Sequence, residues 1–142
     1  MTAPTVRPAR PVARAVLRFD GCFEFVLAAL CLWLAARPPR SGGWALPGWV
    51  GASLMVVVAG VLVLAGVVLL VLAGRVEPAT LRAVSMGNGA TAVALFALAG
   101  LDIGAGPMLR LGLALVGVVV GALALAQAKL AAAAKLAAAE RG

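Results

Sequence analysis

The chain has 142 residues, of which 64% are hydrophobic and only 12% are charged. A soluble domain averages about 45–50% apolar and about 25% charged residues, so this composition excludes a water-soluble fold and predicts that lipid is the solvent. The net charge of +7 comes from residues at the ends of apolar runs, not from a stripe with interleaved aromatic side chains. That distribution argues against nucleic-acid binding and indicates contact with anionic lipid headgroups.

The residue inventory also argues against an enzyme. The chain contains no His and no Tyr, which removes the commonest general base and the commonest metal ligand. Its two cysteines, Cys22 and Cys31, lie nine residues apart, about 180° around a helix and about 13 Å along it, so they cannot bridge or share a metal. We expect both to be small packing residues, and we expect no enzymatic activity, no cofactor and no metal site.

The predicted organisation is all-α, with one transmembrane four-helix bundle. Residues 1–14 are rich in Pro and Arg and are predicted to form a disordered basic tail. Residues 15–128 form the transmembrane domain, with spans at 17–36, 49–73, 81–101 and 108–128, each close to the roughly 20 residues that cross a bilayer. The apolar runs are too long for alternating barrel strands. Residues 129–142 are Ala-rich and are predicted to continue the last helix as a cytoplasmic tail.

A cleaved signal peptide is an alternative for the first apolar segment. An Arg-rich start precedes an apolar core at residues 25–36, as in secretory signals. Glu24 stands directly before that core, and Leu34 precedes the small pair Ala35 and Ala36, which makes a weak cleavage site. These two features favour a retained transmembrane helix.

The positions of Lys and Arg predict the orientation. With the N-terminus inside, the inner segments carry Arg7, Arg10, Arg14, Arg18, Arg75, Arg82, Lys129, Lys135 and Arg141, whereas the outer loops carry Arg37, Arg40 and Arg110. This positive-inside bias places both termini in the cytoplasm. The strong use of Arg, Ala, Leu, Val and Gly is typical of a GC-rich bacterial genome, so we expect a multi-pass protein of the bacterial inner (plasma) membrane.

The two halves of the chain resemble each other. A shift of 64 residues places Arg18 on Arg82 and Glu24 on Asn88. The match indicates either two repeated helical hairpins or the chance similarity of low-complexity apolar sequence, and both explanations stay open. Repeated hairpins would enter the membrane from the same side, as in parallel internal repeats.

Small residues mark helix-packing faces. Ala52, Ala59 and Gly66 recur every seven residues, which predicts a seam against another helix of the same chain. Gly117 and Gly121 form a GxxxG pair that allows close backbone approach. That pair serves either packing within the bundle or a homodimer interface, and the sequence leaves both open.

Polar residues in the first and third spans form the candidate intramembrane site. Acidic residues inside spans normally face the bundle and not the lipid. Asp20 is interpreted as a residue at a helix N-terminus, where a carboxylate favours the helix dipole. Glu24, one turn deeper, is either hydrogen-bonded to Asn88 or Arg82, or is a proton, cation or ligand site. Ser85 belongs to the same small, polar face of the third span as Asn88.

Part of the sequence resembles a known group of membrane proteins. The run EPATLRAVSMGNGATAVALFALAG, followed by a Gly-bearing fourth helix that ends in AQAK, resembles small uncharacterised actinobacterial four-helix membrane proteins, distantly DoxX-like. The resemblance covers most of residues 18–129 and implies a four-helix membrane fold without known catalytic residues. That pattern usually has an aromatic residue soon after the Asn, whereas Gly89 and Ala90 follow here.

These observations lead to two functional hypotheses. The first is an integral membrane protein without enzymatic chemistry, acting as a structural or accessory membrane subunit. The alternative is a small proton-coupled transporter that works as a dimer, with Glu24 as the proton carrier. The expected partners are the lipid bilayer and either a second copy of the chain or another membrane protein.

Overall fold

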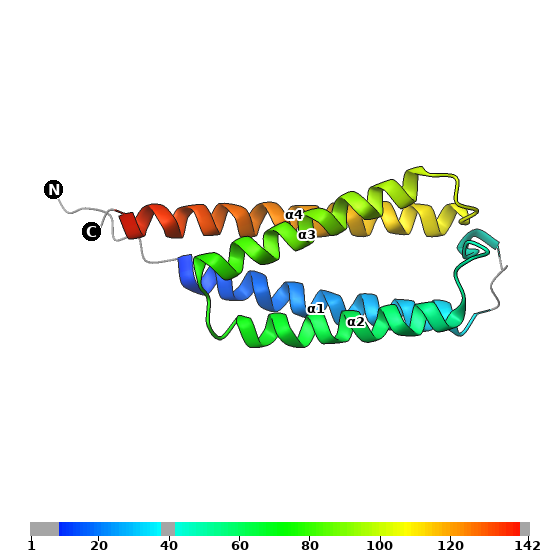
Figure 1. Cartoon of the computed structure of the whole chain (residues 1–142), viewed down its shortest axis with the longest axis horizontal. Coiled ribbons are helices and arrows are strands. Elements are labelled where there is room, and N and C mark those ends of the chain that lie inside the picture. Colours follow the sequence, from blue (N-terminus) through cyan, green and yellow to red (C-terminus); the bar gives the residue numbers. More distant parts are fainter. Residues whose placement is uncertain (1–8, 38–41, 140–142) are drawn as a thin grey trace.

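The chain folds into four long helices. A computed structural model describes residues 9–37 and 42–139 and contains α1 (Ala9–Ala35), α2 (Ala52–Leu72), α3 (Pro78–Gly100) and α4 (Pro107–Ala139) (Figure 1). A short 3₁₀ turn, η1 (Gly42–Trp44), lies in the connection between α1 and α2. The predicted all-α class with four helices is confirmed.

The first and last helices are longer than the predicted spans. Helix α1 begins at Ala9, so residues 9–14, predicted to be a disordered tail, are helical, while residues 1–8 lie outside the described residues. The physical reason is packing: Ala13 is only 2% exposed and belongs to the core with Leu17 and Ala73. Helix α4 runs without a break through the predicted boundary at residue 128 and reaches Ala139.

The helices form two antiparallel hairpins. Helix α1 packs along α2 and α3 packs along α4, while the hairpins meet mainly through α1 and α4 (Figure 1). Both within-hairpin connections lie at one end of the molecule, which we call the loop end. The start of α1, the end of α4 and the α2–α3 connection lie at the opposite end, which we call the terminal end.

The hydrophobic core lies at the terminal end, where all four helices contribute. Its buried members come from α1, α2 and α3, with half-buried residues of α4 packed against them. They are Ala13, Leu17, Leu69, Ala73 and Leu81, with Leu130 and Ala131. The two hairpins are therefore held together most firmly near the start of α1.

The loop end is joined by backbone contacts. The Gly106 N–H donates to the Ala45 carbonyl oxygen at 2.9 Å, which links the connection before α4 to the one before α2. A side chain on Gly106 would collide with the backbone of Gly43, so only glycine allows this approach. On α4, Arg110 donates to the Ala99 oxygen at 2.9 Å and satisfies a carbonyl left free at the end of α3.

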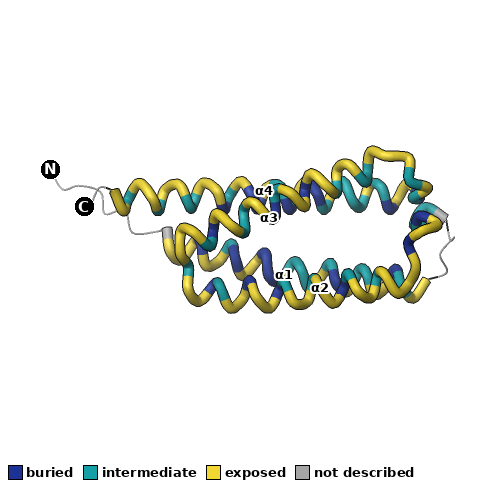
Figure 2. The backbone as a smooth tube through the Cα atoms, viewed as in Figure 1, coloured by how far each residue is buried: buried dark blue, intermediate teal, exposed yellow. Residues whose placement is uncertain are grey.

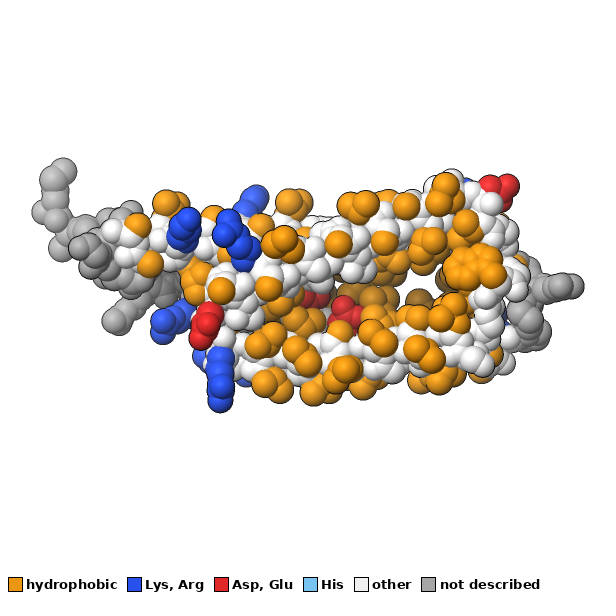
Figure 3. All heavy atoms as spheres, in the orientation of Figure 1, with side chains coloured by type: hydrophobic (Ala, Val, Ile, Leu, Met, Phe, Trp, Pro, Cys, Tyr) orange, Lys and Arg blue, Asp and Glu red, His pale blue; other side chains and the backbone are white. Residues whose placement is uncertain are grey.

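The outer surface is apolar on all four helices. Large hydrophobic side chains are more than half exposed, among them Phe19, Val26, Val57, Val93 and Leu115. Figure 2 shows exposed residues along both hairpins, and Figure 3 shows hydrophobic side chains over both of them. Soluble proteins rarely expose apolar patches of this extent. Helices α2, α3 and α4 are long and apolar enough to cross a membrane. Helix α1 is not among them, and it carries Arg18, Asp20 and Glu24.

Two glycines bring α1 and α2 together. A Cβ atom built on Gly66 would lie 2.8 Å from the Gly21 carbonyl oxygen, and one on Gly21 would lie 3.0 Å from the Gly66 oxygen. Ala59 is buried as well, so this part of the predicted seam faces α1 of the same chain. Ala52 does not belong to the seam: it is exposed, because it begins α2 beside a pocket that separates it from the end of α1.

The GxxxG pair of α4 packs against α3. A Cβ atom on Gly117 would lie 3.3 Å from the Phe96 ring, and one on Gly121 would lie 3.6 Å from the Ala92 Cβ atom. Of the two uses left open by the sequence, packing within the bundle is the one that these contacts support.

The glycine contact between α1 and α2 can be tested with two matched variants. Gly66→Ala should lower the thermal unfolding midpoint in detergent, because its methyl group meets backbone that cannot rotate away, a cost of about 1–3 kcal/mol. Gly60→Ala, in the same helix with nothing within 4 Å, should be neutral or more stable, because Ala favours helix over Gly. Equal midpoints for the two variants would contradict the contact.

Candidate functional site

Three buried polar side chains form a hydrogen-bonded network beside the core. Asp20 of α1, Asn88 of α3 and Gln127 of α4 are 1%, 9% and 0% exposed. The Asn88 Nδ2 donates to Asp20 Oδ2 at 2.8 Å and to Gln127 Oε1 at 3.1 Å. The Gln127 Nε2 donates to the same Asp20 Oδ2 at 2.7 Å. We call these three residues the polar network.

Helical periodicity directs each member of the network inward. Each one follows a buried apolar residue of its own helix by three or seven positions, a spacing that keeps both on one face. Those buried residues are Leu17 before Asp20, Leu81 before Asn88 and Ala124 before Gln127. The polar side chains therefore extend the same inward faces that build the core, and they meet where α1, α3 and α4 come together.

Two amide groups donate to one oxygen of the Asp20 carboxylate. Both amide nitrogens face Asp20 and donate to its Oδ2 atom, which fixes the orientation of Asn88 and Gln127. Asn88 uses both hydrogens of its amide, one on Asp20 and one on Gln127. Removing one partner would leave a buried polar group unsatisfied, at a cost of about 1–3 kcal/mol.

The network corrects the interpretation of Asp20. Helix α1 begins at Ala9, so Asp20 lies in the interior of the helix and not in its first turn. The favourable effect of a helix dipole fades within the first turn. Asp20 is thus a member of the buried site and the prediction that it interacts with the dipole is wrong.

The predicted hydrogen bond of Glu24 to Asn88 or Arg82 is also wrong. The hydrogens of Asn88 go to Asp20 and Gln127. The Glu24 Cβ atom lies 3.3 Å from the position of a Cβ atom on Gly66, so its side chain leaves α1 beside α2. Its Oε2 atom is buried and has no hydrogen-bond partner among the described residues.

A hollow separates the two hairpins beyond the core. Figure 3 shows acidic atoms inside this hollow, with hydrophobic side chains around them. Among the acidic residues of the described chain, Asp20 and Glu24 lie within α1, whereas Glu77 and Asp102 lie in connections between helices. The hollow therefore brings carboxylate and hydrocarbon surfaces close together inside the bundle.

Arg82 and Ser85 lie outside the polar network. Arg82 is exposed, and six residues before Asn88 correspond to about 120° around the helix, so it faces away from the network. The Ser85 Oγ donates to the Ala124 carbonyl oxygen at 2.8 Å, a bond that joins α3 to α4 without reaching Asp20. Of the five predicted site residues, Asp20 and Asn88 are network members and Ser85 forms a helix-to-helix bond. Arg82 is an exposed surface residue, and Glu24 has a buried oxygen without a partner among the described residues.

Gln127 was not predicted as a member of the site. Its position continues the inward face of α4, because Ala124 is three residues after Gly121 and Gln127 is three residues after Ala124. That spacing was a usable signal, since a Gln on the packing face of an apolar helix needs a partner in the bundle.

Neither cysteine joins the site. Cys22 is exposed and Cys31 is half-buried, and both are free. Within residues 9–37 and 42–139, no three His, Cys, Asp or Glu side chains come together in a way that could hold a metal ion.

Comparison with models of known protein families, with curated proteins and with solved structures gives no match. The DoxX-like resemblance therefore stays a prediction. The fold and the site define a class: an all-helical protein with three helices able to cross a membrane. In this chain a buried Asp–Asn–Gln network joins the two hairpins.

Proposed function

We propose that this chain is a multi-pass protein of the bacterial plasma membrane, with α1 as a fourth span and both termini in the cytoplasm. Figure 3 shows most Lys and Arg side chains near the terminal end. In the described chain these are Arg10, Arg14, Arg18, Arg75, Arg82, Lys129 and Lys135, whereas Arg37 and Arg110 lie at the loop end. The positive-inside rule assigns the more basic end to the cytoplasm.

Its charged residues do not prevent α1 from spanning the membrane. The Asp20 carboxylate is hydrogen-bonded inside the bundle, and Arg18, near the terminal end, can extend its head toward the headgroups. The lipid-facing side of α1 is apolar, with Phe19 and Val26 exposed. Trp33 near the end of α1 suits the level of the headgroups.

Within the membrane the chain acts as a structural or accessory subunit without enzymatic chemistry. The observation that carries this function is the polar network, whose members form three hydrogen bonds with one another. A site of that kind stabilises the arrangement of helices, because it joins α1 to α3 and α4 by hydrogen bonds between side chains. The surface left for partners is the apolar exterior, which suits lipid or the helices of another membrane protein.

The orientation is tested with reporter fusions after Ser41, Val76, Ile103 and Gly142. We expect signals outside, inside, outside and inside, because each helix crosses the membrane once and the basic end stays in the cytoplasm. A periplasmic signal after Gly142, or the same side for Ser41 and Val76, would rule out the four-span topology.

A second candidate function is proton-coupled transport through Glu24. The observation that favours it is the buried Oε2 atom without a partner among the described residues. A carboxylate inside a membrane span that forms no structural bond is the kind of group that proton relays use. The two candidates differ in whether the side chain at position 24 must titrate.

Substitution of Glu24 separates the two candidates. We expect Glu24→Gln to fold like the parent in detergent, and we expect proteoliposomes of the parent to show no proton flux above protein-free vesicles under a pH gradient. Glu77→Gln is the matched control, because Glu77 is exposed in the α2–α3 connection. Flux in the parent and in Glu77→Gln that disappears in Glu24→Gln would establish the transporter instead.

A further inference from the structure

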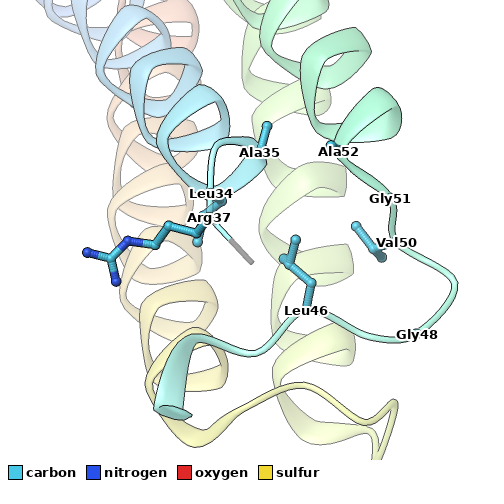
Figure 4. Close-up of a pocket in the computed structure, with 8 residues that line it drawn as sticks. All are labelled: Leu34, Ala35, Arg37, Leu46, Gly48, Val50, Gly51 and Ala52. Atoms are coloured by element: carbon cyan, nitrogen blue, oxygen red, sulfur yellow. The ribbon is translucent and has the colours of Figure 1, made fainter. Parts of the chain in front are cut away.

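A pocket of about 190 Å³ opens at the loop end, between the end of α1 and the start of α2 (Figure 4). Apolar side chains from both helices and from their connection line it. They are Leu34, Ala35, Leu46, Val50 and Ala52. Figure 4 shows Leu46 and Val50 on the connecting segment, facing the space between the two helices. The walls therefore suit hydrocarbon better than water.

Two of the apolar wall residues are buried. Leu34 and Val50 are only 6% and 7% exposed, so neighbouring atoms hold them in place. A Cβ atom built on Gly48 or Gly51, which also line the pocket, would meet nothing within 4 Å. The pocket therefore has open space beside buried apolar side chains, and an apolar chain can bind in that space.

Tryptophans place this pocket at the edge of the hydrocarbon layer. Trp33 and Trp44 pack edge to face with their ring centroids 5.7 Å apart, and Trp49 is 65% exposed in the connection that carries Leu46 and Val50. Trp side chains are enriched at the level of the headgroups. Given the membrane orientation proposed above, on which this step rests, the pocket lies at the depth where the acyl chains of the outer leaflet begin.

A fixed cation lies at the same site. Arg37 lines the pocket, and its guanidinium group lies 3.8 Å from the centre of the Trp33 ring, extending away from the apolar walls (Figure 4). The side chain is exposed, so its N–H groups can donate to an anion while the ring holds the guanidinium plane in place. Phosphate is an anion that matches the planar donor pattern of Arg.

We propose that this pocket binds one phospholipid of the outer leaflet, with an acyl chain against Leu34, Leu46 and Val50 and the phosphate on Arg37. Apolar walls and a guanidinium at headgroup level match the two parts of such a lipid. An anionic headgroup fits best, because Arg37 then meets a net negative charge that a zwitterionic headgroup lacks.

Native mass spectrometry of the delipidated full chain, with defined lipids added back, tests the proposal. The parent should bind one phosphatidylglycerol more tightly than phosphatidylcholine with the same chains. Arg37→Gln should weaken phosphatidylglycerol binding about tenfold through the loss of charge-assisted hydrogen bonds. Arg75→Gln, an exposed Arg at the terminal end, should leave it unchanged.

A second pair of variants tests the acyl-chain part. Ala52→Phe adds a ring at the pocket wall and should abolish binding of both lipids, whereas Ala97→Phe, at an exposed position of α3, should not. Phosphatidylglycerol binding that survives in Ala52→Phe or is unchanged in Arg37→Gln would overturn the proposal. So would inorganic phosphate that competes fully with the lipid, since that result indicates a phosphate site without a chain.

The outcome separates this proposal from the proposed function. If the parent binds no lipid specifically but the reporters give the expected signals, the proposed lipid site is wrong and the four-span topology stands. If the reporter after Ser41 lies in the cytoplasm, the four-span topology is wrong. Lipid that binds to the parent in detergent, but not to Ala52→Phe, would still support the pocket.

Discussion

A carboxylate buried inside a membrane protein must find its hydrogen-bond donors in the protein, because lipid tails offer none. In this chain that constraint falls on Asp20, and the donors are the amides of Asn88 and Gln127. One oxygen of Asp20 accepts from both, so α3 and α4 must approach α1 at one height and with one rotation. Apolar packing alone would tolerate sliding of one hairpin along the other, whereas this bond pattern does not.

Helix α1 connects the rest of the structure. Asp20 is bonded to the second hairpin, and the next residue, Gly21, lies against the backbone of Gly66 in α2. Two successive residues thus fix both neighbours of α1. Beyond this point the hairpins diverge (Figure 3), and Glu24, one turn further along α1, has a buried oxygen without a partner among the described residues. The same geometry that closes the terminal end therefore leaves a hollow and an acidic side chain toward the loop end.

Much of the fold and part of the site could be predicted from the sequence. Apolar run lengths predict four helices, and a polar residue in each of two spans marks Asp20 and Asn88 as members of a site. The sequence could not predict which carboxylate bonds to Asn88, because Asp20 and Glu24 differ by only about 40° around the helix and both fit the inward face. The close approach at Gly21 and Gly66 decides the rotation, and that contact depends on α2. Gln127 lies near the end of a span, where a polar residue is also expected to meet water.

A double-mutant cycle on Asp20 and Gln127, followed by unfolding in detergent, tests most directly whether the polar network joins the hairpins. Asp20→Leu and Gln127→Leu should each lower the free energy of unfolding by about 1–3 kcal/mol. Together they should cost less than the sum, with a coupling of about 1 kcal/mol, because the second change removes a bond already lost. The control cycle pairs Asp20→Leu with Thr91→Val. The Thr91 hydroxyl donates to a carbonyl oxygen of its own helix, so the two losses of unfolding free energy should be additive. Additive losses for Asp20 and Gln127 would contradict the network as the link between the hairpins.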